Sequence, residues 1–178
     1  MKRILLFTAA WFFSQVIAGQ THPYSFQEIG FGFSPPPGYT LIDSTKQTFI
    51  PDEKQKIVSR RFQFGKDKNY VFFSLIRNTG SIKRLDTIYR TEMKHFVEQV
   101  RLNQPRSLVE YDTSTIMLDS QLFHKLVITG TENGQITYRQ TKLYTFYKDY
   151  RLQISWNNKQ EEEGAVIEKA VNGVRFSE

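Results

Sequence analysis

The sequence predicts an α+β fold in which a mostly antiparallel β-sheet packs against two main helices. Strand-like segments follow one another with short turns in two stretches of the chain. Helical periodicity is found in two other stretches, one between the strand groups and one near the C-terminus. Strands and helices that are segregated in this way favour an antiparallel sheet with helices packed on it.

The first eighteen residues have the pattern of a cleavable signal peptide. Lys2 and Arg3 precede an apolar run, and Val16 and Ala18 fit the −3 and −1 positions of a cleavage site. We therefore predict cleavage after Ala18, with Gly19 as the alternative, and a mature chain in the periplasm or outside the cell. The rival interpretation is an uncleaved anchor, which needs about 20 predominantly apolar residues. No later segment approaches that length.

The mature chain is long enough for a single domain. Residues 19–30 suggest a flexible leader, and residues 31–178 are expected to form one domain. The absence of cysteine excludes disulfides, thiol catalysis and sulfur-ligated zinc. The core alone must therefore stabilise this exported domain.

The first strands surround a proline corner. The prolines at 35–37 force an extended geometry and exclude helix and central-strand pairing, so the strand before them is expected at a sheet edge. Two later runs flank a polar turn at 66–69 and predict a hairpin. The expected strands are 31–33, 39–42, 48–50, 57–64 and 70–76.

Residues 85–101 change to helical periodicity, and Pro105 lies just beyond the end of the pattern. One apolar stripe is formed by Tyr89, Met93, Phe96, Val97 and Val100.

From residue 108 onward, four strands in succession predict an antiparallel meander. Asn133-Gly134 favours the type I′ turn of a two-residue hairpin. The last element is predicted to be a helix. Asn158 and Glu161 stand in capping-box relation, and the acids at 161–163 suit the positive end of the helix dipole.

Positive charge is concentrated in residues 54–106, which hold thirteen Lys and Arg and four acids. Such a region either attracts an anionic surface or partner, or is an ordinary solvated face. Our candidate anion- or partner-binding residues are Lys54, Lys56, Arg60, Arg61, Lys66 and Lys68. The other cations of the region are Arg77, Lys83, Arg84, Arg90, Lys94, Arg101 and Arg106.

Aromatic side chains are abundant in the meander. They either form a core beneath the helices or provide rings on which a glycan or apolar ligand stacks. Tyr138 and Tyr147 are the members expected to be exposed, and are our candidate ligand-stacking residues.

No motif for catalysis, metal binding or cofactor binding is found. His22, His95 and His124 are far apart in sequence, and no Gly-x-Ser-x-Gly pattern occurs. We assign no catalytic residue, metal or cofactor. A further alternative is a hydrolase that uses His124 with nearby acids. Nucleic acid is not expected as a partner of an exported chain without a recognition motif.

The order of elements resembles the PsbP/DcrB-like superfamily of small α/β/α domains. The resemblance lies in Phe31-Gly-Phe-Ser-Pro-Pro-Pro-Gly-Tyr39 and in Tyr150–Ile154 followed by residues 163–176. It spans residues 25–177 and rests on degenerate structural motifs. The triple proline departs from the family pattern, and no site residue is carried over. The resemblance implies an α/β/α sandwich and a non-enzymatic binding or assembly role.

These observations predict an exported, non-catalytic domain without a transmembrane span in its mature form. Its expected partner is an anionic surface or a protein of the cell envelope. The alternative function is a carrier of a small apolar or glycan ligand, held in an aromatic pocket between sheet and helix.

Overall fold

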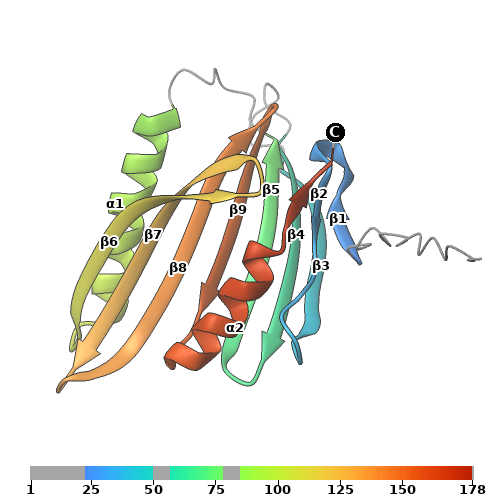
Figure 1. Ribbon diagram of the computed structural model, residues 1–178. Helices are drawn as coiled ribbons and strands as arrows, with labels where there is room; N and C mark the ends of the chain where they lie inside the picture. Colours follow the sequence, from blue (N-terminus) through green and yellow to red (C-terminus); the bar gives the residue numbers. More distant parts are fainter. Residues whose placement is uncertain (1–22, 50–56, 78–84, 178) are drawn as a thin grey trace, which may run out of the picture.

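The computed structural model describes residues 23–49, 57–77 and 85–177, and Figure 1 shows their arrangement. The helices are η1 (Gln27–Ile29), a single 3₁₀ turn, α1 (Leu85–Asn103) and α2 (Glu161–Asn172). The strands are β1 (Tyr24–Phe26), β2 (Phe31–Phe33), β3 (Thr40–Phe49), β4 (Ile57–Lys66), β5 (Asn69–Arg77), β6 (Leu108–Leu118), β7 (Gln121–Glu132), β8 (Gln135–Tyr147), β9 (Tyr150–Asn157) and β10 (Arg175–Phe176).

A seven-stranded antiparallel sheet forms the centre of the fold, in the order β3-β4-β5-β9-β8-β7-β6. The meander β6–β9 and the hairpins β3–β4–β5 are joined where β9 pairs with β5. This pairing places β9, the last strand of the meander, in the middle of the sheet. The predicted α+β fold with a mostly antiparallel sheet is confirmed.

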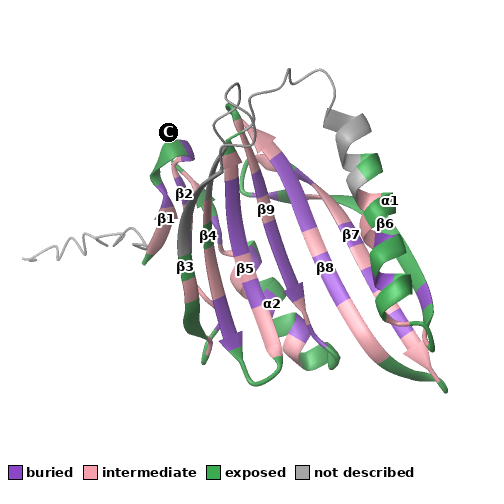
Figure 2. Cartoon of the chain, turned by 180° about the vertical axis from the view of Figure 1, so that it is seen from behind, coloured by how far each residue is buried: buried purple, intermediate pink, exposed green. Residues whose placement is uncertain are grey.

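The two main helices lie on opposite faces of this sheet, as Figures 1 and 2 show. We call these faces the α1 face and the α2 face. On the α1 face, Val97 and Val100 pack with Val109, Leu126 and Ile128 of β6 and β7. The resulting arrangement is an α/β/α sandwich. Within the described residues, no helix is long and apolar enough to cross a membrane.

The main core lies on the α2 face. Ile167 and Val171 of α2 are buried with Ile154 and Trp156 of β9. These side chains belong to one continuous cluster that extends beneath a second, three-stranded sheet. Figure 2 shows buried residues running along β5 and β9 at the centre of the large sheet.

The second sheet has the order β1-β2-β10 and corrects two expectations. Part of the predicted leader, residues 24–29, belongs to the folded domain, because Phe26 and Ile29 are fully buried. Residues 31–33 form the central strand of this sheet, since both β1 and β10 pair with β2. The prolines at 35–37 follow that strand and so do not disrupt its pairing. The assignment of residues 1–18 lies outside the described part.

The C-terminal tail closes over the N-terminal segment at Gly30. The backbone N–H of Ser177 donates a hydrogen bond to the Gly30 carbonyl at 2.8 Å. Gly30 has a φ of +64°, and a Cβ at this position would approach the Ser177 carbonyl oxygen to 2.1 Å. Only glycine therefore permits this contact between the two ends of the domain.

Local turn chemistry was predicted correctly at Asn133-Gly134. Both residues have positive φ, 52° and 76°, as a type I′ turn requires. The expected pieces 39–42 and 48–50 differ from the structure, because β3 runs without interruption from Thr40 and absorbs an irregularity as a bulge near Leu41 and Asp43.

The predicted capping box of α2 does not form. The N-cap residue is Gln160, which makes no side-chain capping hydrogen bond. Asn158 is buried instead, and its Nδ2 donates to the Gln160 carbonyl at 2.8 Å. The Asn158 amide therefore stabilises the turn that precedes the helix.

Candidate functional site

The two predicted arginines of β4 do not share a surface. Arg60 and Arg61 are consecutive strand residues, so their side chains point to opposite faces of the sheet. Arg60 Nη1 contacts both carboxylate oxygens of Glu28, at 2.9 and 3.0 Å. Arg61 forms an ion pair with Asp43. Each guanidinium therefore already has a carboxylate partner.

The predicted lysines do not form a common site either. Lys66 and Lys68 are exposed at the turn between β4 and β5. Lys66 lies six residues from Arg60 along one strand, which corresponds to about 20 Å. Lys54 and Lys56 lie outside the described residues. The structure thus does not gather the described members of this set into one binding surface.

The two predicted ligand-stacking tyrosines also lie apart. Tyr147 packs on the α2 face, with its ring centroid 5.2 Å from that of Phe176. Tyr138 packs beside α1 on the other face, and its hydroxyl donates a hydrogen bond to Gln140 Oε1. Burial, with a smaller contribution from Tyr70, raises the pKa of Tyr138. The two rings cannot contact one ligand.

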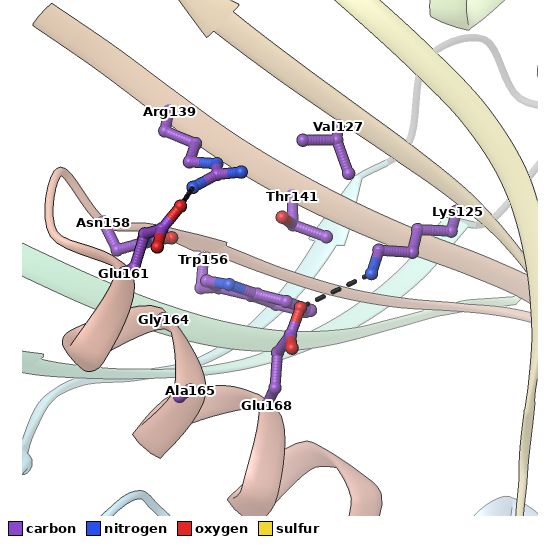
Figure 3. Close-up of a pocket in the computed structure, with 10 residues that line it drawn as sticks. All are labelled: Lys125, Val127, Arg139, Thr141, Trp156, Asn158, Glu161, Gly164, Ala165 and Glu168. Atoms are coloured by element: carbon purple, nitrogen blue, oxygen red, sulfur yellow. Dashed lines mark hydrogen bonds and ion pairs between the residues drawn. The ribbon is translucent and has the colours of Figure 1, made fainter. Parts of the chain in front are cut away.

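A small groove lies between α2 and the large sheet, with Trp156 at its floor (Figure 3). Its volume is about 250 Å³. Lys125 Nζ lies 3.4 Å from Glu168 Oε1, and Arg139 Nη1 lies 3.8 Å from Glu161 Oε1. We call this the α2 groove. The lining residues are Lys125, Val127, Arg139, Thr141, Trp156, Asn158, Glu161, Gly164, Ala165 and Glu168.

The α2 groove has little capacity for a ligand. Each of its cations is paired with a carboxylate of α2, so its charges compensate one another. Trp156 is only 2% exposed, which leaves little ring surface for stacking. Its volume is also below the roughly 300–1,000 Å³ typical of small-molecule sites.

A second groove, of about 560 Å³, lies between α1 and the strands β6 and β7. This volume is within the range of ordinary ligand sites. We call it the α1 groove. The lining residues are Arg90, Met93, Lys94, Thr113, Ser114, Thr115 and His124.

The α1 groove is electropositive. Arg90 and Lys94 stand four residues apart on α1, so both cations lie on the same side of the helix. None of the lining residues that the structure describes is acidic. Within the described part of the chain, neither cation forms an ion pair with a carboxylate. The groove thus holds two positive charges that are available to an anion.

Hydrogen-bonding side chains complete this wall. Thr113 and Thr115 alternate along β6 and therefore face the same side of the sheet. His124 is the cross-strand neighbour of Thr115 on β7. Hydroxyl, imidazole, ammonium and guanidinium groups are all donors to anionic oxygens.

The core fixes the position of α1 above these strands. Lys142 Nζ of β8 lies 2.9 Å from the centroid of the Phe96 ring. Met93, which lines the groove, packs partly against the same small core as Val97. The groove wall is therefore anchored by buried contacts one turn further along the helix.

The histidines and the acidic side chains at the start of α2 are dispersed. His95 is exposed on α1, whereas His124 lines the α1 groove. Glu161 pairs with Arg139, but Glu163 accepts a hydrogen bond from Asn69 Nδ2 at 2.6 Å, so these acids diverge. Among the described residues, no three His, Cys, Asp or Glu side chains are placed to hold a metal ion.

Arg90 and Lys94 belong to the basic region of residues 54–106 but were not among the predicted anion-binding residues. Their spacing of four residues on a helix was a usable signal. The contribution of Thr113, Thr115 and His124 could not be read locally, because β6 lies beside α1 only after the sheet has formed.

Comparisons with known proteins give a resemblance in structure and none in sequence. No protein-family model matches the chain, and no curated protein matches its sequence. Among solved structures, the chain is similar to LpqN of Mycobacterium tuberculosis, described as involved in cell envelope biogenesis. The TM-score is 0.39 at 11% identity, over 83% of each chain.

Proposed function

We propose that this protein is an exported, non-catalytic binding domain that takes up an anionic group of a cell-envelope partner in the α1 groove. The observation that carries the proposal is that Arg90 and Lys94 lie together in a groove whose described lining residues include no acid. An anion there gains two charge-assisted contacts and displaces no carboxylate.

The exported location is supported by the first eighteen residues. A basic start, an apolar run and Ala18 at the expected cleavage position are typical of a signal peptide. Membership of the PsbP/DcrB-like superfamily remains part of this proposal, and is supported by the opening strand before the prolines and by the final strand and closing helix.

A non-catalytic role is supported by the surroundings of His124. General-base catalysis requires a positioned proton acceptor, commonly oriented by a further group such as a carboxylate. The lining residues described for the α1 groove include no Asp or Glu. A hydrolase built on His124 therefore has little support.

The alternative function, a carrier of an apolar or glycan ligand beneath a helix, has weaker support. The aromatic floor of the α2 groove is a nearly buried Trp156, and the groove volume is about 250 Å³. Tyr138 and Tyr147 lie on opposite faces of the sheet.

A thermal-shift titration with inorganic phosphate tests the anion-binding proposal. Phosphate is compared with chloride at matched ionic strength, using the wild type, Arg90→Glu/Lys94→Glu and the matched control Lys66→Glu/Lys68→Glu. Ligand that binds only the folded state raises the melting temperature. The control has the same change in net charge, at an exposed turn outside the groove.

We expect phosphate to stabilise the wild type and the Lys66/Lys68 variant, and to lose its effect in the Arg90/Lys94 variant. Equal shifts in all three proteins would contradict the proposal, because they would report a general response of a basic chain to salt. The absence of any shift in the wild type would contradict it as well.

A further inference from the structure

An apolar rim lies one cross-strand pair beyond Thr115 and His124 of the α1 groove. Met117 of β6 and Leu122 of β7 are cross-strand neighbours, and 56% and 48% of their surfaces are exposed. Single exposed apolar side chains are common on proteins. An adjacent exposed pair next to the residues of a groove is more informative, because contiguous apolar surface indicates a binding site.

The rim and the polar wall form successive rows of one sheet face. Thr115 and His124 are paired across β6 and β7, and Met117 and Leu122 are the next pair on the same face. Two residues along a strand correspond to about 7 Å. A ligand can therefore contact both rows at once.

The α1 side of the groove also combines polar and apolar side chains. Arg90 and Lys94 supply positive charge, while Met93 supplies a flexible apolar side chain between them in sequence. Methionine adapts to irregular apolar ligands, because its unbranched side chain has several rotatable bonds. Apolar surface is thus present on both walls, and positive charge lies on the wall that α1 forms.

We propose that the α1 groove binds an anionic amphiphile, with a phosphate head group on Arg90 and Lys94 and an alkyl chain along Met93, Met117 and Leu122. This inference rests on the proposed function, since it assigns a ligand class to the same groove. A simple inorganic anion would use the cations and leave the apolar rim exposed to water.

The alkyl chain supplies the additional affinity. Each methylene removed from water contributes a factor of about four to an equilibrium constant. Coverage of the rim by three or more methylenes would strengthen binding by well over tenfold. Such a ligand could enter as a soluble monomer or from a bilayer, and both sources present the same phosphate and alkyl chemistry.

Calorimetric titration of the purified protein tests this inference. The probes are dodecyl phosphate below its critical micelle concentration, inorganic phosphate and dodecanol. The variant Met117→Ser/Leu122→Ser removes the rim, and Leu102→Ser/Val166→Ser is the matched control. Leu102 and Val166 are 72% and 43% exposed and do not line the groove.

We expect dodecyl phosphate to bind the wild type and the control at least tenfold more tightly than inorganic phosphate. The rim variant should lose most of this advantage while its affinity for inorganic phosphate is unchanged. Dodecanol should bind more weakly than dodecyl phosphate, because it lacks the head-group charge.

Two results would separate the failure of this inference from that of the proposed function. Equal affinity for both phosphates, or an advantage that survives in the rim variant, would overturn the amphiphile and keep the anion site. Failure of both phosphates to bind would overturn both. Vesicles of phosphatidylglycerol, compared with dodecyl phosphate monomers, then identify the source: binding to monomers alone supports a soluble ligand, and binding to vesicles supports a bilayer lipid.

Discussion

Lys142 lies over the ring of Phe96, with its Nζ 2.9 Å from the ring centroid, and this contact joins α1 to β8. A cation above an aromatic face contributes about 0.5–2 kcal/mol, depending on desolvation. The contact lies in the small core that positions the wall of the α1 groove.

Replacement of Phe96 by Leu should therefore lower the free energy of unfolding by about 1–2 kcal/mol, because the cation–π contact and part of the packing are lost. Urea denaturation measures the change. Leu102→Ala on the same helix is the control and should stay within about 0.5 kcal/mol. If the two variants were equally stable, α1 would not be anchored at this point.

Phe26 tests the boundary of the folded domain. The side chain is fully buried, and its ring centroid lies 5.6 Å from that of Phe33. Phe26→Ala should cost about 3–5 kcal/mol through the cavity that it leaves. The control is Gln27→Ala at the exposed neighbouring residue, which should change the free energy of unfolding little. Chemical denaturation measures the free energy of unfolding. If Phe26→Ala lowered it by less than about 1 kcal/mol, residues 24–29 would belong to a flexible leader and not to the folded domain.

Alkaline pH should report the buried tyrosines of the α1 face. Burial raises the pKa of both Tyr138 and Tyr70 above the usual 10. The folded state therefore holds these protons when the unfolded state has begun to release them. Their contribution to stability is complete below pH 10 and is lost as the pH rises further.

Replacement of Tyr138 by Phe should make the loss of stability above pH 10 shallower. Below that pH, the variant should be less stable by about 1–3 kcal/mol, because the buried Gln140 Oε1 loses the hydrogen bond that Tyr138 donates. Urea denaturation between pH 8 and 11 measures both effects. Identical slopes for variant and wild type would show that Tyr138 does not titrate in this way.

Local signals in the sequence were sufficient for many elements. The helical period and Pro105 predicted α1, and Asn133-Gly134 predicted its hairpin. Such features depend on neighbours in sequence, which is why they could be recognised without a structure. The strand order could not be recognised from the sequence, because the pairing of β5 with β9 joins residues about eighty positions apart.

The candidate site also combines features that the sequence reveals locally with features that depend on the fold. Clustering of cations in sequence indicated a basic region. The side chains of Arg60 and Arg61 nevertheless point to opposite faces of the sheet, because consecutive strand residues alternate. Helix geometry keeps Arg90 and Lys94 together instead. The groove itself depends on the placement of β6 beside α1, which no local pattern in the sequence specifies.

Export is tested by the N-terminus of the secreted protein. Mass spectrometry should find a chain that begins at Gly19, since Ala18 occupies the −1 position. The variant Ala18→Arg places a bulky, charged residue at the −1 position. It should block cleavage and leave a chain that retains residues 1–18. A natural protein that retains Met1 in the envelope would contradict the signal-peptide assignment.

The most direct test of the anion site is a map of phosphate binding by NMR. Backbone amide resonances are followed as inorganic phosphate is added at constant ionic strength. We predict the largest shifts at Arg90, Lys94, Thr113, Thr115 and His124. Shifts centred on Lys66 and Lys68, or on the α2 groove around Arg139, would contradict the account.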